Sequence, residues 1–245
     1  MSWSATPHGP PVELGKAQEA YNHLREAILT FELRGGQPVS ERMLGDEVGS
    51  SRTSVRAALA RLEADGLIRR RGRSYEVTSI DPQEIGQAHE LLLAIEPAAL
   101  LLAQDDGLRE KLDAMQGIVD RVVADPALET YSQAVLDYHS ALVRLSGNDF
   151  FARASDDAQT RLVRAAWLTR WLDPAARLDW APQNKIIKLM RRNERKEAAK
   201  ILSKLLRDSQ RHMTSLVIQY RQGLLAHGVA VDKVRSRAAA ANDGQ

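Results

Sequence analysis

Arginine side chains gather at two places in the first third of the sequence. Arg52 and Arg56 lie four residues apart, and the run RRRGR at residues 69–73 places four more around Gly72. A guanidinium group makes paired hydrogen bonds to phosphate and to the O6 and N7 edge of guanine. These residues could therefore bind nucleic acid, provided that the elements carrying them bring both groups to one surface.

Arg52 and Arg56 belong to a predicted helix. The serines at 50–51 can each cap a helix that runs to about residue 65, where Gly66 ends it. At about 100° per residue, its apolar side chains fall on one arc that we expect to be buried. These residues are Val55, Ala58, Leu59 and Leu62. The adjoining arc presents Arg52, Thr53 and Arg56 beside two alanines, so that another surface can approach closely.

The elements around this helix follow a recognisable order. The spacing of apolar residues predicts a first helix over about 16–33 and a short second helix that starts at Ser40 and stops at Gly49. After the arginine helix, residues 67–71 and 74–79 have the alternation of two strands. Helix, short turn, helix and basic hairpin occur in the order of a winged helix-turn-helix, which places one helix in the major groove of DNA.

Residues 18–79 resemble the N-terminal domain of the GntR family of bacterial transcription regulators. The resemblance is carried by YNHLREAILT, by SERMLGDEVGSSRTSVRAALARLEADGL and by the hairpin that follows. One departure is ELRGGQP, where members of the family usually have a Pro-Gly turn. The resemblance implies that DNA is contacted by Arg42, Ser51, Arg52, Thr53, Arg56, Arg71 and Gly72.

The second part of the chain is helical almost throughout. Aspartate, proline and glycine residues separate six predicted helices, over about 82–104, 106–124, 127–146, 149–172, 181–192 and 194–226. The expected fold is mainly α: a winged helix-turn-helix at 16–79, with three helices and a small β-hairpin, followed by an all-α bundle at 82–227. We expect residues 1–15 to form a flexible arm and residues 232–245 a flexible tail.

The helical part resembles the effector domain of the FadR subfamily, in AHELLLAIEPAALLLA, YHSALVRLSGN and NKIIKLMRRNERKEAAKIL. Many such domains hold a divalent metal through an aspartate four residues before a histidine and two later histidines 22 residues apart. Here His139 matches the first histidine, but Val135 stands at the aspartate position, and Asn184 and Leu206 stand at the later positions. Asp137 lies about 200° around the helix from His139 and cannot replace the aspartate. We therefore expect no metal and no cofactor.

A small-molecule effector is the ligand that this resemblance implies, either an organic acid or an acyl-CoA-like metabolite. Relatives often carry an arginine ahead of the glutamate of IEP, where this chain has leucines at 91–93, so we expect a more apolar or a vestigial pocket. Its candidate polar residues are His139, Arg161, Arg164 and Asn184. A core histidine and solvent-facing arginines would explain the first three equally well. The tryptophans at 167, 171 and 180 are predicted to pack in the core.

Composition limits the function further. The 245 residues carry a net charge of +2, so any attraction to DNA must come from local charge. The absence of cysteine excludes disulfides and thiolate zinc sites. No apolar run reaches the length of a membrane span and no signal peptide precedes the first helix, so we expect a cytoplasmic protein without a membrane partner. No motif for nucleophilic catalysis or for binding phosphate in a glycine-rich loop indicates an enzyme.

These observations predict a homodimeric transcription regulator, most simply a repressor. It would bind an inverted-repeat operator in double-stranded DNA and respond to a small-molecule effector in its helical domain. Two alternatives remain open. One is an effector-independent DNA-binding or architectural protein with a vestigial pocket, and the other is an enzyme with a DNA-targeting module.

Overall fold

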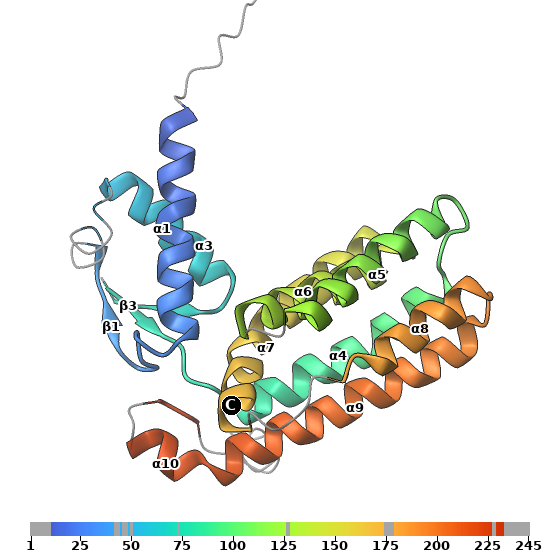
Figure 1. Cartoon of the computed structure of the whole chain (residues 1–245). Helices are drawn as coiled ribbons and strands as arrows, with labels where there is room; N and C mark the ends of the chain where they lie inside the picture. Colours follow the sequence, from blue (N-terminus) through green and yellow to red (C-terminus); the bar gives the residue numbers. More distant parts are fainter. Residues whose placement is uncertain are drawn as a thin grey trace, which may run out of the picture. The chain divides into compact units, whose positions relative to one another are not determined.

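The computed structural model describes residues 11–41, 45, 49, 51–72, 74–125, 128–173, 179–226 and 229–232. The chain divides into two compact units. Within the described ranges, the first unit contains residues 11–79 with 229–230, and the second contains residues 80–226 with 231–232. Figure 1 shows the helices and strands of both units.

Among the described residues of the first unit, the helices α1 (Pro11–Leu29) and α3 (Arg52–Ala64) pack against each other. We expected α1 over about 16–33, after a flexible arm. It starts earlier because proline fits the first turn of a helix, where the backbone N–H groups have no helical partner. It ends earlier because Phe31 has a φ of 63°, in the left-handed region that a right-handed helix does not use. The rest of the expected arm lies outside the described residues.

The prediction for α3 is confirmed. Val55, Ala58, Leu59 and Leu62 are all buried, as the arc of apolar residues indicated, and Ser54 is buried with them. The second predicted helix, after Ser40, falls largely outside the described residues.

A three-stranded antiparallel sheet completes the first unit. Its strands are β1 (Pro38–Val39), β2 (Ile68–Arg71) and β3 (Ser74–Val77), in the order β1-β3-β2. The predicted hairpin is confirmed, with Arg71 opposite Ser74 at its end. The strand β1 was not predicted, because two residues are too few to show the alternation that marks a strand.

In its described residues the second unit is a helical bundle, with one isolated parallel β-bridge between Ile80 and Val231. Its helices are α4 (Pro82–Leu101), α5 (Leu108–Ala124), α6 (Leu128–Arg144), α7 (Asp149–Leu172), α8 (Ala181–Arg191), α9 (Arg195–Gln219) and α10 (Arg221–Ala226). Within this unit α4 and α9 lie side by side, and α7 packs against α4, α6 and α9 (Figure 1). Each helix buries apolar residues toward its neighbours, which gives the bundle a core made largely of leucine, isoleucine, valine and alanine.

The last long helix differs from its prediction. We expected one helix over 194–226, but it is broken at Tyr220, whose φ of −93° and ψ of 3° depart from helical values. The break redirects the chain so that Leu224 of α10 is buried, with 3% of its surface exposed. No helix in the described ranges is both long and apolar enough to cross a membrane.

Candidate nucleic-acid interface and ligand cavity

The exposed face of α3 begins at its N-cap. The Ser51 side chain accepts a hydrogen bond from the backbone N–H of Ser54 at 3.2 Å, which fixes the start of the helix. From that start, Arg52, Thr53 and Arg56 are all exposed, next to the buried arc. The buried arc therefore holds the helix in place, and the adjoining face leaves two cations and a hydroxyl group accessible to a ligand.

Arg56 is oriented by an acidic neighbour. Its Nε–H donates to both carboxylate oxygens of Glu41, at 2.8 and 2.9 Å, while 69% of the arginine side chain remains exposed. This pairing uses only Nε, so the two terminal nitrogens can still donate to a base or a phosphate. The sequence predicted Arg56 as a contact residue but did not identify Glu41 as its partner, since the two lie 15 residues apart.

The arginines of the hairpin surround a second carboxylate. Glu76 is buried, with 4% of its surface exposed, and accepts hydrogen bonds from Arg69 at 2.6 Å and from Arg71. These two guanidinium groups lower the pKa of the Glu76 carboxyl. Arg70 instead lies over the ring of Tyr75, 5.7 Å from its centroid.

Glu76 is buried although it is a charged residue, on the opposite face of β3 from Tyr75 and Val77. Antiparallel pairing places Arg69 directly opposite Glu76. The side chains of Arg69 and Arg71 both donate to the Glu76 carboxylate and cover it. Gly72 has a φ of 63° at the turn, a conformation that glycine adopts at little cost.

One residue of the predicted interface, Arg42, lies outside the described residues, as does Arg73 of the basic run. The described members, Ser51, Arg52, Thr53, Arg56, Arg71 and Gly72, all belong to the first unit and are all exposed. Their roles as DNA contacts remain predictions.

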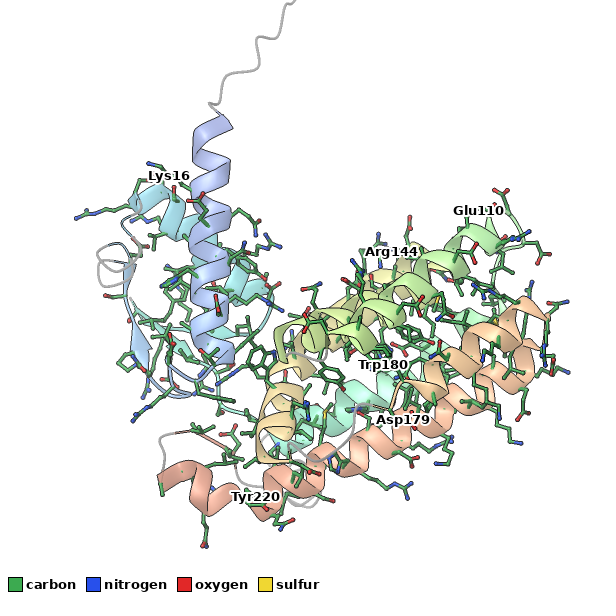
Figure 2. The ribbon with its side chains drawn as sticks, in the orientation of Figure 1. Lys16, Glu110, Arg144, Asp179, Trp180 and Tyr220 are labelled. Carbon is green, nitrogen blue, oxygen red and sulfur yellow. The ribbon has the colours of Figure 1, made fainter. Side chains whose placement is uncertain are left out.

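A cavity of about 390 Å³ lies inside the second unit. Its described walls come from α4, α6, α7 and α9 and from the start of α8. The apolar part of the wall includes Leu92, Val135, Leu136, Leu162, Val163 and Leu206. Asp179 and Trp180 contribute to the wall at the start of α8, where both are labelled in Figure 2. Trp180 makes edge-to-face contacts with Tyr131 and Tyr138, so it packs in the core as predicted.

His139 brings a buried polar cluster to this cavity. Its Nδ1–H donates to the carboxylate of Glu96, 2.8 and 3.0 Å from the two oxygens. Glu96 is fully buried and also accepts from the hydroxyl of Ser155 at 3.1 Å and the amide of Gln159 at 3.2 Å. Since Nδ1 is used in this pairing, Nε2 is the ring nitrogen that His139 can offer to a ligand. The sequence indicated His139 but missed Glu96, which looked like one more residue of an apolar helix.

A second histidine of the wall is held in its neutral form. The Nδ1–H of His89 donates to the carbonyl of Ile85 at 2.8 Å, and the hydroxyl of Ser209 donates to Nε2 at 3.3 Å. Burial lowers the pKa of His89. Both ring nitrogens are used within the protein, and burial disfavours a positive charge on His89.

The other three candidate effector residues do not line the described wall of the cavity. Arg161 is exposed and pairs with Glu84 and Asp157. Arg164 is buried, and burial lowers its pKa to about 10. Asn184 accepts a hydrogen bond from Gln116 at 2.8 Å, on the side toward α5. The neighbouring Gln183 lines the cavity instead.

The positions that hold a metal in the resembling domains do not fit one here. Val135 and Leu206 line the cavity and supply no ligand atom, while Asn184 is directed to Gln116. His139 is then the single metal-binding side chain among these positions, and its Nδ1 is bound to Glu96. One histidine is too few ligands for a divalent transition metal. Across the residues that the structure describes, no three histidine, aspartate or glutamate side chains are grouped as metal ligands.

Comparison with known proteins gives the same division of the chain. The family of bacterial regulatory proteins named gntR matches residues 16–75, and the FCD domain matches residues 87–208. Over 118 residues the chain is 31% identical to an HTH-type transcriptional regulator from the TAR-I ttuE-ttuC' intergenic region of Agrobacterium vitis, covering 44% of this chain and 69% of that protein. It is 27% identical over 97 residues to the regulator YdhC of Bacillus subtilis, covering 39% of this chain and 43% of YdhC.

Solved structures share the fold. A transcriptional regulator from Rhodococcus sp. RHA1 aligns with a TM-score of 0.64 and 19% identity, over 82% of this chain and 98% of that one. Lar, which controls expression of the Listeria monocytogenes agr system, aligns with a TM-score of 0.60 and 20% identity, over 86% of this chain and all of that one. The two matched domains and the Agrobacterium relative show that this chain belongs to the GntR family of bacterial regulatory proteins, with an FCD domain after its DNA-binding domain.

Proposed function

We propose that the chain is a sequence-specific DNA-binding transcription regulator, acting in the cytoplasm as a homodimeric repressor. Residues 16–79 would read one half-site of an inverted repeat, and residues 82–227 would form the dimer and bind a small molecule. The observation that carries this proposal is the face of α3, where Arg52, Thr53 and Arg56 are exposed beside a fully buried apolar arc. A helix of this kind fits the major groove, and arginine reads guanine there.

The wing supports the same proposal. Arg69, Arg70 and Arg71 are all exposed on β2, close to the turn at Gly72. Positive side chains at the tip of a hairpin suit a phosphate backbone or a groove next to the one that the helix enters. We therefore assign α3 to base recognition and the hairpin to affinity.

The first experiment selects binding sites from random double-stranded DNA and then measures the affinity of single variants for the selected site. Arg52→Ala should weaken binding about 5- to 150-fold, corresponding to about 1–3 kcal/mol, and should relax the base preference at one position of each half-site. Arg109→Ala is the matched control, because Arg109 is equally exposed but belongs to the second unit. Unchanged affinity and base preference in Arg52→Ala would remove α3 as the recognition helix.

A further inference from the structure

The cavity of the second unit extends along two helices, α7 and α6. Its wall on α7 extends from Gln159 to Arg170, and eleven residues at about 1.5 Å each span about 16 Å. Its wall on α6 extends from Tyr131 to His139, which spans about 12 Å. Glu96 binds both His139 and Gln159, so these two residues mark one end. The charge of Arg170 acts on Tyr131, so those two mark the other end.

The end at His139 can carry little positive charge. Glu96 is a fully buried carboxylate, and its three hydrogen-bond donors are His139, Ser155 and Gln159. Burial lowers the pKa of His89, which disfavours a positive charge on its ring, and both of its ring nitrogens already contact protein groups. Among the described residues that line this end, His139 is the one group that can be a cation. A protonated His139 does no more than balance Glu96, so this end is neutral at most.

This charge balance disfavours an anionic head group at the His139 end of the cavity. A carboxylate bound at Nε2 of His139 would place a second anion beside Glu96 in a buried site, and an uncompensated buried charge is strongly disfavoured. Val135 and Leu206 stand where the resembling domains have metal ligands, and their apolar side chains cannot hold a metal ion that would offset that charge. A hydroxyl group can donate or accept a hydrogen bond, so it pairs with Nε2 whether or not His139 is protonated.

We infer that the cavity binds, without a metal ion, an elongated apolar molecule that carries an uncharged hydroxyl group at one end. The hydroxyl bonds to Nε2 of His139, and the apolar body lies along α7 against Leu162, Val163 and Ala166. The cavity volume of about 390 Å³ is near the lower end of the 300–1,000 Å³ typical of small-molecule sites, which favours a small ligand over a large thioester. This inference rests on the proposed function, because it names the ligand class of the proposed effector site.

The test uses three probes of equal length and different charge: 1-octanol, octanoate and octylammonium. Their affinities for the purified full chain are measured by calorimetry with EDTA present. We expect 1-octanol to bind at least about tenfold more tightly than either ion, a difference of about 1.4 kcal/mol. Octanoate binding as tightly as 1-octanol, no binding of any probe, or tight octanoate binding on addition of Zn²⁺ would each overturn the inference.

Two variants locate the probe and test the charge argument. Ala166→Phe fills the middle of the wall and should abolish 1-octanol binding. Glu96→Gln keeps the shape of the side chain and removes the anion, so octanoate should gain at least about tenfold relative to 1-octanol. Glu90→Gln, an exposed position on the same helix, should leave the preference unchanged. An unchanged preference in Glu96→Gln would show that the carboxylate does not set ligand charge.

Selection of DNA sites by the ligand-free protein tests the regulator proposal independently of the ligand class. If the chain selects a DNA sequence but binds no octyl probe, the ligand class is wrong and the regulator proposal stands. If the chain selects no sequence, the regulator proposal fails whatever the three probes do.

Discussion

The carboxylate of Glu76 occupies two of the arginines that the wing would offer to DNA. Arg69 and Arg71 each donate to one of its oxygens, although 60% and 76% of their side chains are exposed. Each arginine uses one terminal nitrogen in its pair, so its other N–H groups can still donate to phosphate, but the nearby carboxylate offsets part of the positive charge that attracts DNA. We therefore expect Glu76 to lower the affinity of the wing for any DNA and to make binding depend more on the contacts of α3.

The variant Glu76→Gln should release these arginines. Each additional phosphate that the protein neutralises steepens the dependence of log K on log salt by about 0.9, so we expect a slope steeper by about 1–2 on unselected DNA. The folded state should lose about 1 kcal/mol or less, because both ion pairs are largely solvent-exposed on the arginine side. Salt titrations of DNA binding measure the slope, with Glu84→Gln of the second unit as control. An unchanged or shallower slope would contradict the proposed role of Glu76.

Some residues at the cavity could be predicted from the sequence, and others could not. His139 was predicted because its motif marks it, and it does line the cavity. Asn184 was predicted, but Gln183 lines the cavity; the two side chains differ by about 100° around α8, and a resemblance between sequences does not fix a position that closely. Glu96 was missed because a single acid in an apolar helix does not reveal its hydrogen-bond partners, which come from α6 and α7.

At the scale of elements, side-chain contacts join α1 and α3 in the first unit, among them a hydrogen bond from Arg61 to Gln18 at 2.6 Å. The hydroxyl of Tyr21 on α1 donates to Asp65 at 2.6 Å, and Asp65 is the C-cap residue of α3. Arg61 of α3 lies over the same ring, 3.9 Å from its centroid. Burial, followed by the hydrogen bond to Asp65, raises the pKa of Tyr21 to about 12. The pair thus fixes the end of the proposed recognition helix against α1.

The raised pKa of Tyr21 makes the stability of this unit depend on alkaline pH. The pKa of Tyr21 in the folded protein exceeds its value in the unfolded chain, which is about 10. The stability that the protonated Tyr21 contributes to the folded protein is therefore complete below pH 10 and is lost as the pH rises through 12. Between pH 9 and pH 11 the free energy of unfolding of the wild type should fall by about 1 kcal/mol more than that of Tyr21→Phe. At pH 7 the variant should be less stable by about 0.5–1.5 kcal/mol. Urea unfolding at the three pH values measures both quantities, and parallel pH curves for the two proteins would contradict the assignment.

The elements that the sequence predicted well are those with a long periodic pattern. The buried arc of α3 and the starts of α7 and α8 follow from apolar spacing and from helix-capping residues. The strand β1 and the break at Tyr220 were missed for a common reason. Neither shows in a local pattern: β1 is defined by its pairing with β3, and the break at Tyr220 precedes a short helix in which Leu224 is buried.

At the scale of the whole molecule, the net charge of +2 requires that affinity come from a local surface. The exposed cations of α3 and of the hairpin belong to one compact unit, which on its own can cover only one half-site. In the proposed homodimer, the second copy of the chain carries the same surface, which doubles the number of DNA phosphates that are neutralised. Such a dimer should have twice the chain mass of 27.2 kDa in a native mass spectrum.

The spacing of half-sites tests the dimer on DNA. In a two-fold symmetric complex the two recognition helices meet the same face of the duplex, at a separation fixed by the protein. Inserting about 5 base pairs, half a helical turn, at the centre of the selected inverted repeat places the half-sites on opposite faces. We therefore expect affinity to fall at least about tenfold, to that of a single half-site, since each half-site supplies several of the neutralised phosphates. Titrations on the original, the lengthened and the half-site duplexes measure this. Equal affinity for the original and lengthened duplexes would mean that each copy of the chain binds its half-site alone.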